Sequence, residues 1–244
     1  MAQVSDIGID LGTSHVYIMA RNRGIVLSEP AVVAVERDSR KIITFGTDAF
    51  RMMGRTPGTV SAIRPLRNGT VNDFQLMNDM LRQFVAHVVG HHFFSRPRAV
   101  LSVPSGMNDI EKRQLINIMF DAGVRKTQLM DRPIAAALGA GLNFTDHYGC
   151  MIIDMGAGMT DIAVLALGEV VVSSSVQVGG DYFDDAIVRF LRKKHNLLVG
   201  DRTAEEIKIS IGSAYKGTEI AGRTMEVTGR NLVSGLPKTV TVTA

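Results

Sequence analysis

Two short stretches combine an acid, glycine and hydroxyl-bearing residues in the way that a phosphate-binding turn requires. The first reads DLGTSH and contains Asp10, and the second reads DMGAGMTD and contains Asp154. A tight glycine turn brings backbone N–H groups close to an anion, and Ser or Thr hydroxyls add donors. An acid beside it is placed to hold Mg²⁺, usually through water. One such turn alone is more typical of an ordinary hairpin, whereas the pair with matched acids favours phosphate binding.

Both stretches lie inside the same larger pattern, which indicates an internal duplication. DIGIDLGTSHVYIMA begins at Asp6, and CMIIDMGAGMTDIAVLA begins at Cys150. Each reads as an apolar strand, a glycine turn and a second apolar strand. A unit used twice, far apart in the chain, predicts two similar halves that face each other across a cleft.

The segments around these motifs predict a mixed α/β fold. GIVLSEPAVVAVE, KIITFG and RAVLSVP are typical of strands, whereas residues 73–93 have apolar residues at helical spacing. Residues 108–123 are also predicted to form a helix, which ends at Gly123. Asn108 and Glu111 form a capping-box pattern at the start of the second helix. Thr203 and Glu206 predict the same kind of start for a later helix.

Composition narrows the class of protein. The net charge of +3 does not require nucleic acid as a partner, and 45% hydrophobic residues permit a sizeable core. No apolar run reaches the ~18 residues of a membrane-spanning helix, and the first residues do not resemble a signal peptide. The single cysteine, Cys150, cannot form an internal disulfide, which fits a reducing cytosolic setting.

The order of the segments resembles the actin-like ATPase superfamily and, within it, the MreB/Mbl group of bacterial cell-shape proteins. The resemblance covers essentially the whole chain, through blocks that include DIGIDLGTSHVYIM, GIVLSEPAVVAV, AIRPLRNGTVNDF, VPSGMNDIEKRQ, IIDMGAGMTDIAVLALG and GDRTAEEIKISIGSAY. It implies an actin-like fold: a duplicated, ribonuclease H-like α/β fold of two domains with a nucleotide cleft.

The resemblance also implies a division of the chain. The first half would comprise residues 1–145, with a small outer subdomain at about 30–72. Residues 146–244 would form part of the second half, with a small outer subdomain from about 184. Family members continue past GLPKTVTVT, so the resemblance implies truncation at the C-terminus.

The implied cofactors are ATP and Mg²⁺. The phosphate contacts would come from Gly12, Thr13, Ser14 and His15, and from Gly156, Ala157, Gly158 and Met159. Asp10 and Asp154 match the acids around Mg²⁺. The segment matching the adenosine contacts is Glu205, Glu206, Ile207 and Lys208. Without the family, Glu205 and Lys208 would be read as a charge pair on a capped surface helix.

Three residues depart from the family pattern in the two turns. His15 stands where the family usually has Asn, and a neutral imidazole can still donate one hydrogen bond. Ala157 replaces a glycine and restricts φ. Met159 replaces a threonine whose hydroxyl would help to place the γ-phosphate or the attacking water.

The stretch MDRPIAAALGAG departs from the family at the position that matters for hydrolysis. Asp131 and Pro133 suit a helix start, but a cation such as Arg132 is unfavourable there by ~0.3–1 kcal/mol. The resemblance places Arg132 where the family has the glutamate that orients the attacking water. A guanidinium cannot act as a base, although it can pair with a phosphate. We hypothesise that the chain binds ATP but hydrolyses it slowly or not at all, unless a shifted helix start lets Asp131 substitute.

The stretch HHFFSRP suggests a membrane contact. Phe93 and Phe94, followed by Arg96 and Arg98, suit an interface with anionic lipid. The resemblance supports this, since apolar residues of the matching loop enter the membrane. In the alternative, both rings pack onto the adjoining helix.

The function implied by the resemblance is that of an ATP-binding cytoskeletal protein. Homopolymeric filaments on the inner face of the cytoplasmic membrane would determine rod shape by organising cell-wall synthesis, with morphogenesis proteins as partners. The contact between subunits would be a heterologous one that does not close. A sugar kinase would need an acid as base and a sugar site, and a chaperone would need a peptide-binding domain. A non-hydrolysing structural paralogue, or a fragment without polymerisation activity, stays open because of Arg132 and Met159.

Overall fold

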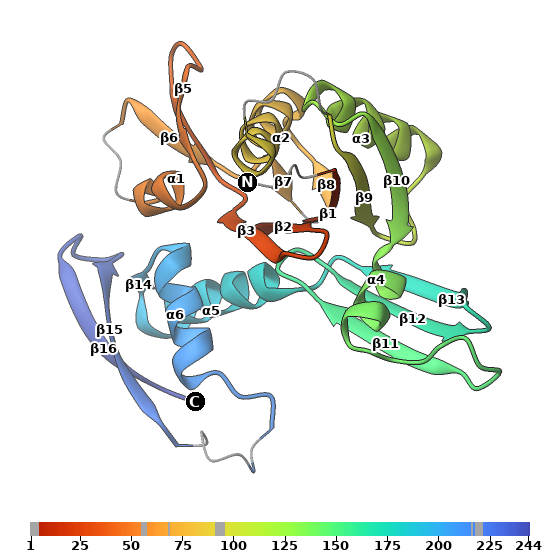
Figure 1. The fold of residues 1–244 in the computed structure, drawn as a ribbon. Coiled ribbons are helices and arrows are strands. Elements are labelled where there is room, and N and C mark those ends of the chain that lie inside the picture. Colours follow the sequence, from red (N-terminus) through yellow and green to blue (C-terminus); the bar gives the residue numbers. More distant parts are fainter. Residues whose placement is uncertain (1–4, 55–57, 68, 91–95, 216, 218–221) are drawn as a thin grey trace. The chain divides into compact units, whose positions relative to one another are not determined.

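The computed structural model describes residues 5–54, 58–67, 69–90, 96–215, 217 and 222–244. The chain divides into two compact units, Met1–Gln177 and Val178–Ala244 (Figure 1). Each unit has a hydrophobic core of its own. Within the described residues, no helix combines the length and apolar character needed to cross a membrane.

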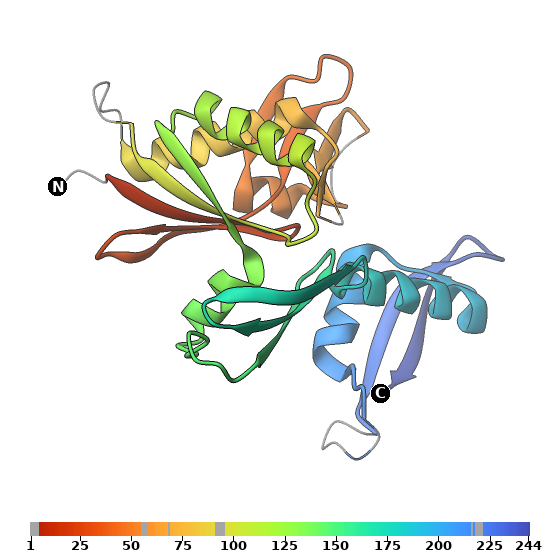
Figure 2. The ribbon, with the colours of Figure 1, turned by 90° about the vertical axis from the view of Figure 1, so that its right-hand side faces the viewer.

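A five-stranded sheet forms the centre of the first unit. Its order is β10–β9–β1–β2–β3. The strands are β1 (Asp6–Leu11), β2 (His15–Ala20), β3 (Gly24–Pro30), β9 (Arg98–Val103) and β10 (Lys126–Asp131). β1, β2 and β3 are antiparallel, whereas β9 is parallel to both β1 and β10. In both views α2 (Phe74–Val89) and α3 (Asp109–Asp121) lie on one face of this sheet (Figures 1 and 2).

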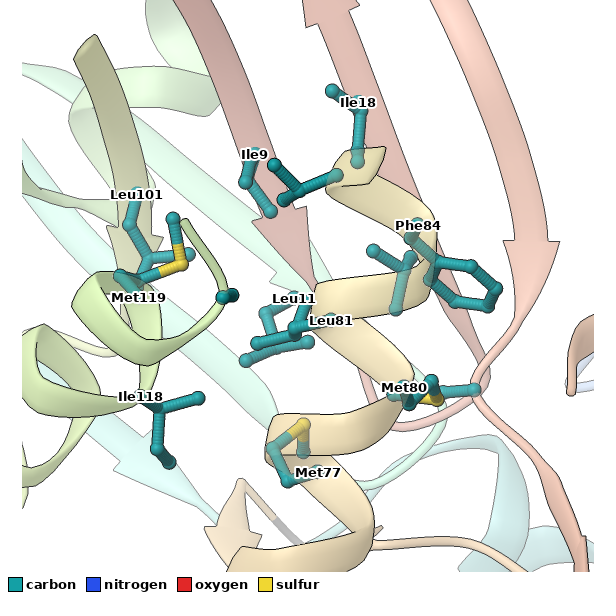
Figure 3. Close-up of a cluster of buried hydrophobic side chains, with 14 of the residues drawn as sticks. Ile9, Leu11, Ile18, Met77, Met80, Leu81, Phe84, Leu101, Ile118 and Met119 are labelled. Carbon is teal, nitrogen blue, oxygen red and sulfur yellow. The ribbon is translucent and has the colours of Figure 1, made fainter. Parts of the chain in front are cut away.

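The core of this unit forms where the alternating pattern of the strands meets the apolar faces of the two helices. Every second residue of β1 is buried, as a strand with one covered face requires. The close-up shows side chains of α2 and α3 pointing toward those of the sheet (Figure 3). The labelled members of this cluster are Ile9, Leu11, Ile18, Met77, Met80, Leu81, Phe84, Leu101, Ile118 and Met119.

Side-chain caps fix where the two helices begin. Asn108 Oδ1 accepts a hydrogen bond from the Glu111 N–H at 2.9 Å, and Glu111 Oε2 accepts one from the Asn108 N–H at 3.2 Å. This confirms the predicted capping box of α3. Asp73 caps α2 by accepting from the Leu76 N–H at 3.0 Å.

A smaller sheet occupies the region predicted as an outer subdomain at about 30–72. Its order is β5–β4–β6, from β4 (Val33–Glu36), β5 (Ile42–Phe45) and β6 (Val60–Ile63), with α1 (Gly46–Met52) packed on it. A short hairpin of β7 (Leu66–Arg67) and β8 (Thr70–Val71) follows. The Glu29 carboxylate ties this region to β3, because it accepts hydrogen bonds from Thr47 N and Oγ1 at 2.7 and 2.8 Å.

The second copy of the motif forms an antiparallel sheet of three strands. These are β11 (Cys150–Met155), β12 (Thr160–Ala166) and β13 (Glu169–Val176). The helix α4 (Arg132–Gly139) packs on the sheet through Ala137, which lies in one cluster with Ile152 and Leu165. This sheet belongs to the first compact unit, which ends at Gln177. The division into halves at residue 145 stays a prediction.

The second unit is a sheet with two helices. It comprises α5 (Gly180–His195), β14 (Leu197–Leu198), α6 (Asp201–Ile211), β15 (Thr224–Asn231) and β16 (Pro237–Thr243), and its sheet order is β14–β15–β16. The cap predicted from Thr203 and Glu206 is wrong, because α6 already begins at Asp201 and Glu206 pairs instead with Arg202 at 3.2 Å. This unit covers the stretch in which the second outer subdomain is predicted.

Candidate functional site

The two glycine turns close with an equivalent backbone hydrogen bond. The Gly12 N–H donates to the His15 carbonyl at 3.0 Å, and the Gly156 N–H donates to the Met159 carbonyl at 2.9 Å. A Cβ on Gly12 would lie 2.8 Å from the His15 oxygen, and one on Gly156 would lie 3.2 Å from the Met159 oxygen. The first turn therefore leaves no room for a Cβ at its glycine and the second leaves little, which agrees with the predicted duplication.

The tips of both turns present backbone N–H groups. Within the described residues, the N–H groups of Thr13, Ser14, Ala157 and Gly158 donate to no backbone carbonyl. Successive donors of this kind are what an anion-binding turn supplies. None of these four residues has a positive φ, so alanine at position 157 introduces no backbone strain.

His15 and Met159 stand at equivalent positions and contact different neighbours. His15 Nδ1 lies 2.9 Å from Ser14 Oγ, and its ring stacks at 6.0 Å on Tyr17. Met159 is buried, and a Cβ on Gly69 would collide with its sulfur. The methionine at the threonine position therefore packs against the backbone after β7 and offers no hydroxyl to a phosphate.

Arg132 links the strands that carry the two turns. Its Nη1 lies 3.3 Å from Asp161 Oδ2, on β12, and its Nη2 donates to the Leu11 carbonyl at 3.4 Å, at the end of β1. Its Nε is 3.8 Å from Asp10 Oδ1. The cation at the start of α4 interacts unfavourably with the helix dipole, and the two carboxylates and the carbonyl compensate this interaction.

The residues that flank Arg132 occupy the predicted helix start. Asp131 is the N-cap residue of α4 and Pro133 lies in its first turn, as the sequence predicts. Among the described residues, the Asp131 side chain makes no capping hydrogen bond. The helix start places the Arg132 guanidinium beside the strands that carry both turns.

Asp161 is a site residue to which the sequence analysis gave no role. It is 1% exposed and also accepts a hydrogen bond from Ser175 Oγ, on β13. Asp161 pairs in register with Asp154 across β11 and β12. The available signal was its place at the end of DMGAGMTD, directly opposite an acid already chosen as a candidate.

The strands that carry the two turns bring three acids, Asp10, Asp154 and Asp161, close to the Arg132 guanidinium. Burial raises the pKa of Asp154, the nearby Arg132 lowers it, and Asp10 and Asp161 raise it. Asp10 in turn accepts a hydrogen bond from Ser102 Oγ, on β9. Within the described residues, no group of three or more His, Cys, Asp or Glu side chains is arranged to hold a metal ion. With a guanidinium already beside these acids, the residues present fit Mg²⁺ poorly, because like charges repel.

The predicted adenosine segment lies on α6 in the second unit. Lys208 Nζ pairs with Asp184 Oδ2 at 2.9 Å and donates to the Gly180 carbonyl at 3.1 Å, so it joins α6 to α5. Glu205 is half-buried. Lys208 thus forms its ion pair across two helices, and the suggested pairing with Glu205 is replaced by one with Asp184.

The remaining two residues of the predicted adenosine segment are Glu206 and Ile207. Glu206 is exposed, and Ile207 is 4% exposed within the core of the second unit. The predicted membrane residues Phe93 and Phe94 lie outside the described residues. A role of these four residues in binding stays a prediction.

The order of the central sheet and the duplicated turns define an actin-like protein. The solved structure of MreB5 of Spiroplasma citri bound to ADP matches with a TM-score of 0.91 and 34% identity, over 98% of this chain and 71% of that one. The same protein bound to AMPPNP matches equally well. A MamK double helical filament matches with a TM-score of 0.76 at 22% identity, which supports the fold alone.

The family follows from sequence comparison. The family model described as MreB/Mbl protein matches residues 4–244. The cell shape-determining protein MreB of Escherichia coli is 43% identical over 243 residues, covering 98% of this chain and 70% of the relative. Mbl of Bacillus cereus is 41% identical over 237 residues, covering 97% and 71%. The chain belongs to the MreB/Mbl family, so the sugar kinase and chaperone alternatives are set aside.

Proposed function

We propose that this protein is an ATP-binding, actin-like cytoskeletal protein that holds phosphates between the turns Gly12–His15 and Gly156–Met159. The observation that carries the proposal is the reach of Arg132, which contacts the end of β1 and the start of β12 at once. Both turns therefore serve one site. Similarity to a protein solved with ADP and with AMPPNP supports a nucleotide as the ligand.

The proposed adenosine contacts are the α6 residues Glu205, Glu206, Ile207 and Lys208. They come from the family resemblance, and the Lys208–Asp184 ion pair would hold this helix against α5. The Ile207 side chain would act by packing rather than by direct contact, since it is buried.

Binding is tested by titrating the protein with ATP while measuring heat or the fluorescence of a labelled analogue. Ala157→Asp places a carboxylate at the tip of the second turn and should abolish saturable binding by charge repulsion. Ala86→Asp makes the same change at an exposed position of α2 and should bind like the wild type. Equal binding by both variants would remove the phosphates from these turns.

The proposed rate of hydrolysis is low. Arg132 stands at the position of the family glutamate, and a guanidinium takes up no proton from water. Its contacts with Asp161 and Asp10 hold it in place. Asp131, at the N-cap, would have to replace the arginine in space before it could act as base. The non-hydrolysing structural paralogue therefore remains the second candidate.

Filament formation is proposed from family membership. The expected assembly is a homopolymer on the inner face of the cytoplasmic membrane that guides cell-wall synthesis. Electron microscopy with and without ATP tests it: filaments that lengthen with ATP support the cytoskeletal function. Purely monomeric protein at high concentration would favour the paralogue without polymerisation activity.

Membrane contact is proposed for Phe93 and Phe94. The arginines that follow them engage protein groups: Arg96 lies 5.6 Å from the centre of the Phe120 ring, and Arg98 pairs with Asp6 at 2.6 Å. The attraction should therefore depend mainly on the two phenylalanines.

Pelleting with anionic liposomes tests this contact. Phe93→Ser with Phe94→Ser should leave the protein in the supernatant. Ile110→Ser removes an exposed apolar side chain from α3 and should not change pelleting. Undiminished pelleting of the double variant would rule the contact out.

A further inference from the structure

The Arg132 guanidinium occupies the place at which a metal ion would have to meet the acids of the two turns. It lies 3.8 Å from Asp10 and 3.3 Å from Asp161, and its side chain is 15% exposed. A divalent cation entering here would face a fixed positive charge in partly desolvated surroundings. Such repulsion is much stronger than in bulk water.

The acids need a cation whether or not a nucleotide is bound. Asp161 is almost fully buried, and its partners are Ser175 and Arg132. A buried carboxylate is costly unless it is paired. Arginine stays charged at any physiological pH and carries several donors in a fixed plane, so it can serve two carboxylates and a carbonyl together.

We propose that Arg132 is the built-in counter-cation of the two phosphate turns, so that this chain binds nucleotide without a divalent metal. The guanidinium then takes over the charge neutralisation that the sequence assigns to Mg²⁺ at Asp10 and Asp154. The nucleotide part of this inference rests on the proposed function. The part that concerns the protein without nucleotide does not.

The first test measures thermal unfolding of the 244-residue chain without nucleotide, in EDTA and in millimolar MgCl2. The wild type should have the same Tm in both. Arg132→Gln should have a lower Tm in EDTA and recover part of the loss in MgCl2, because the freed acids then attract the metal. Arg98→Gln, which breaks the exposed pair with Asp6, should show no response to MgCl2.

Arg132→Lys keeps a positive charge and serves as a second variant in case Arg132→Gln does not fold. Its Tm should not respond to MgCl2. If the glutamine variant does not fold, the wild-type Tm in the two buffers decides. A wild-type Tm that rises in MgCl2 would overturn the inference.

The second test titrates ATP in the same two buffers. The wild-type affinity in EDTA should stay within about threefold of that in MgCl2, which is less than 1 kcal/mol. Loss of wild-type binding in EDTA would overturn the metal-free claim. If the wild type binds ATP in neither buffer, the proposed function fails, while the unfolding data still decide the role of Arg132.

Discussion

At the scale of single residues, the central feature is an arginine that pairs with acids from both copies of one motif. Arg132 contacts Asp161 closely and Asp10 more distantly, while its backbone begins α4. The sequence alone places a cation at a helix start, which is mildly unfavourable. Its compensation depends on residues 29 and 121 positions away, which only the folded chain brings together.

Asp161→Asn should destabilise the protein, because it leaves Arg132 without its closest carboxylate in a partly buried place. We expect a loss of about 2–3 kcal/mol in the free energy of unfolding, somewhat below that of a fully buried broken pair. Urea denaturation measures it. Asp48→Asn breaks the exposed pair with Arg51 and should change stability by less than about 1 kcal/mol. Equal small losses would mean that the buried pair contributes little.

Asp154 should make stability depend on pH. Its pKa is raised above 3.8 in the folded chain, chiefly by burial, so the folded state holds the proton to higher pH than the unfolded state does. The contribution of this group is therefore favourable at low pH and is lost as pH rises through the raised pKa. Asp154→Asn mimics the protonated form, so its stability relative to the wild type should increase with pH across that window. Unfolding in urea over a pH series checks this, and a difference independent of pH would contradict it.

At the scale of elements, the two strand–turn–strand units position every candidate phosphate contact. Gly12→Ala should distort the first turn, because the new Cβ would lie 2.8 Å from the His15 carbonyl. We expect a loss of about 1–3 kcal/mol in stability, as for other overpacked sites, together with weakened ATP binding. Gly106→Ala is the matched control, since its Cβ would meet no described atom within 4 Å and its φ is not positive. Normal ATP binding by Gly12→Ala would count against the turn as a phosphate contact.

Local patterns were sufficient to predict most elements. A short apolar run predicted β9, and the Asn108–Glu111 cap with Gly123 at the far end predicted α3. The start of α6 was predicted wrongly, because Gly200 supplies the N-cap position without any side-chain signal. The pairing of Lys208 with Asp184 was also missed, since it joins two helices and leaves no trace in local spacing.

At the scale of the whole molecule, the duplication and the order of segments were enough to identify the family. The MreB/Mbl model matches residues 4–244, and the chain spans 70–71% of the length of the relatives compared. The compact units divide after Gln177, and the division into halves at residue 145 stays a prediction. The division into compact units depends on packing contacts in the folded chain. A duplicated motif is visible in the sequence, but those packing contacts are not, so the sequence could not predict this division.

The most direct test is a single-turnover assay in which excess protein binds ATP labelled at the γ-phosphate. The bound ATP should be recovered intact over many minutes, because Arg132 stands where an acid would orient the attacking water. Release of labelled phosphate at a rate comparable with that of ordinary family members, and abolished by Asp10→Ala, would contradict a site that binds ATP without cleaving it.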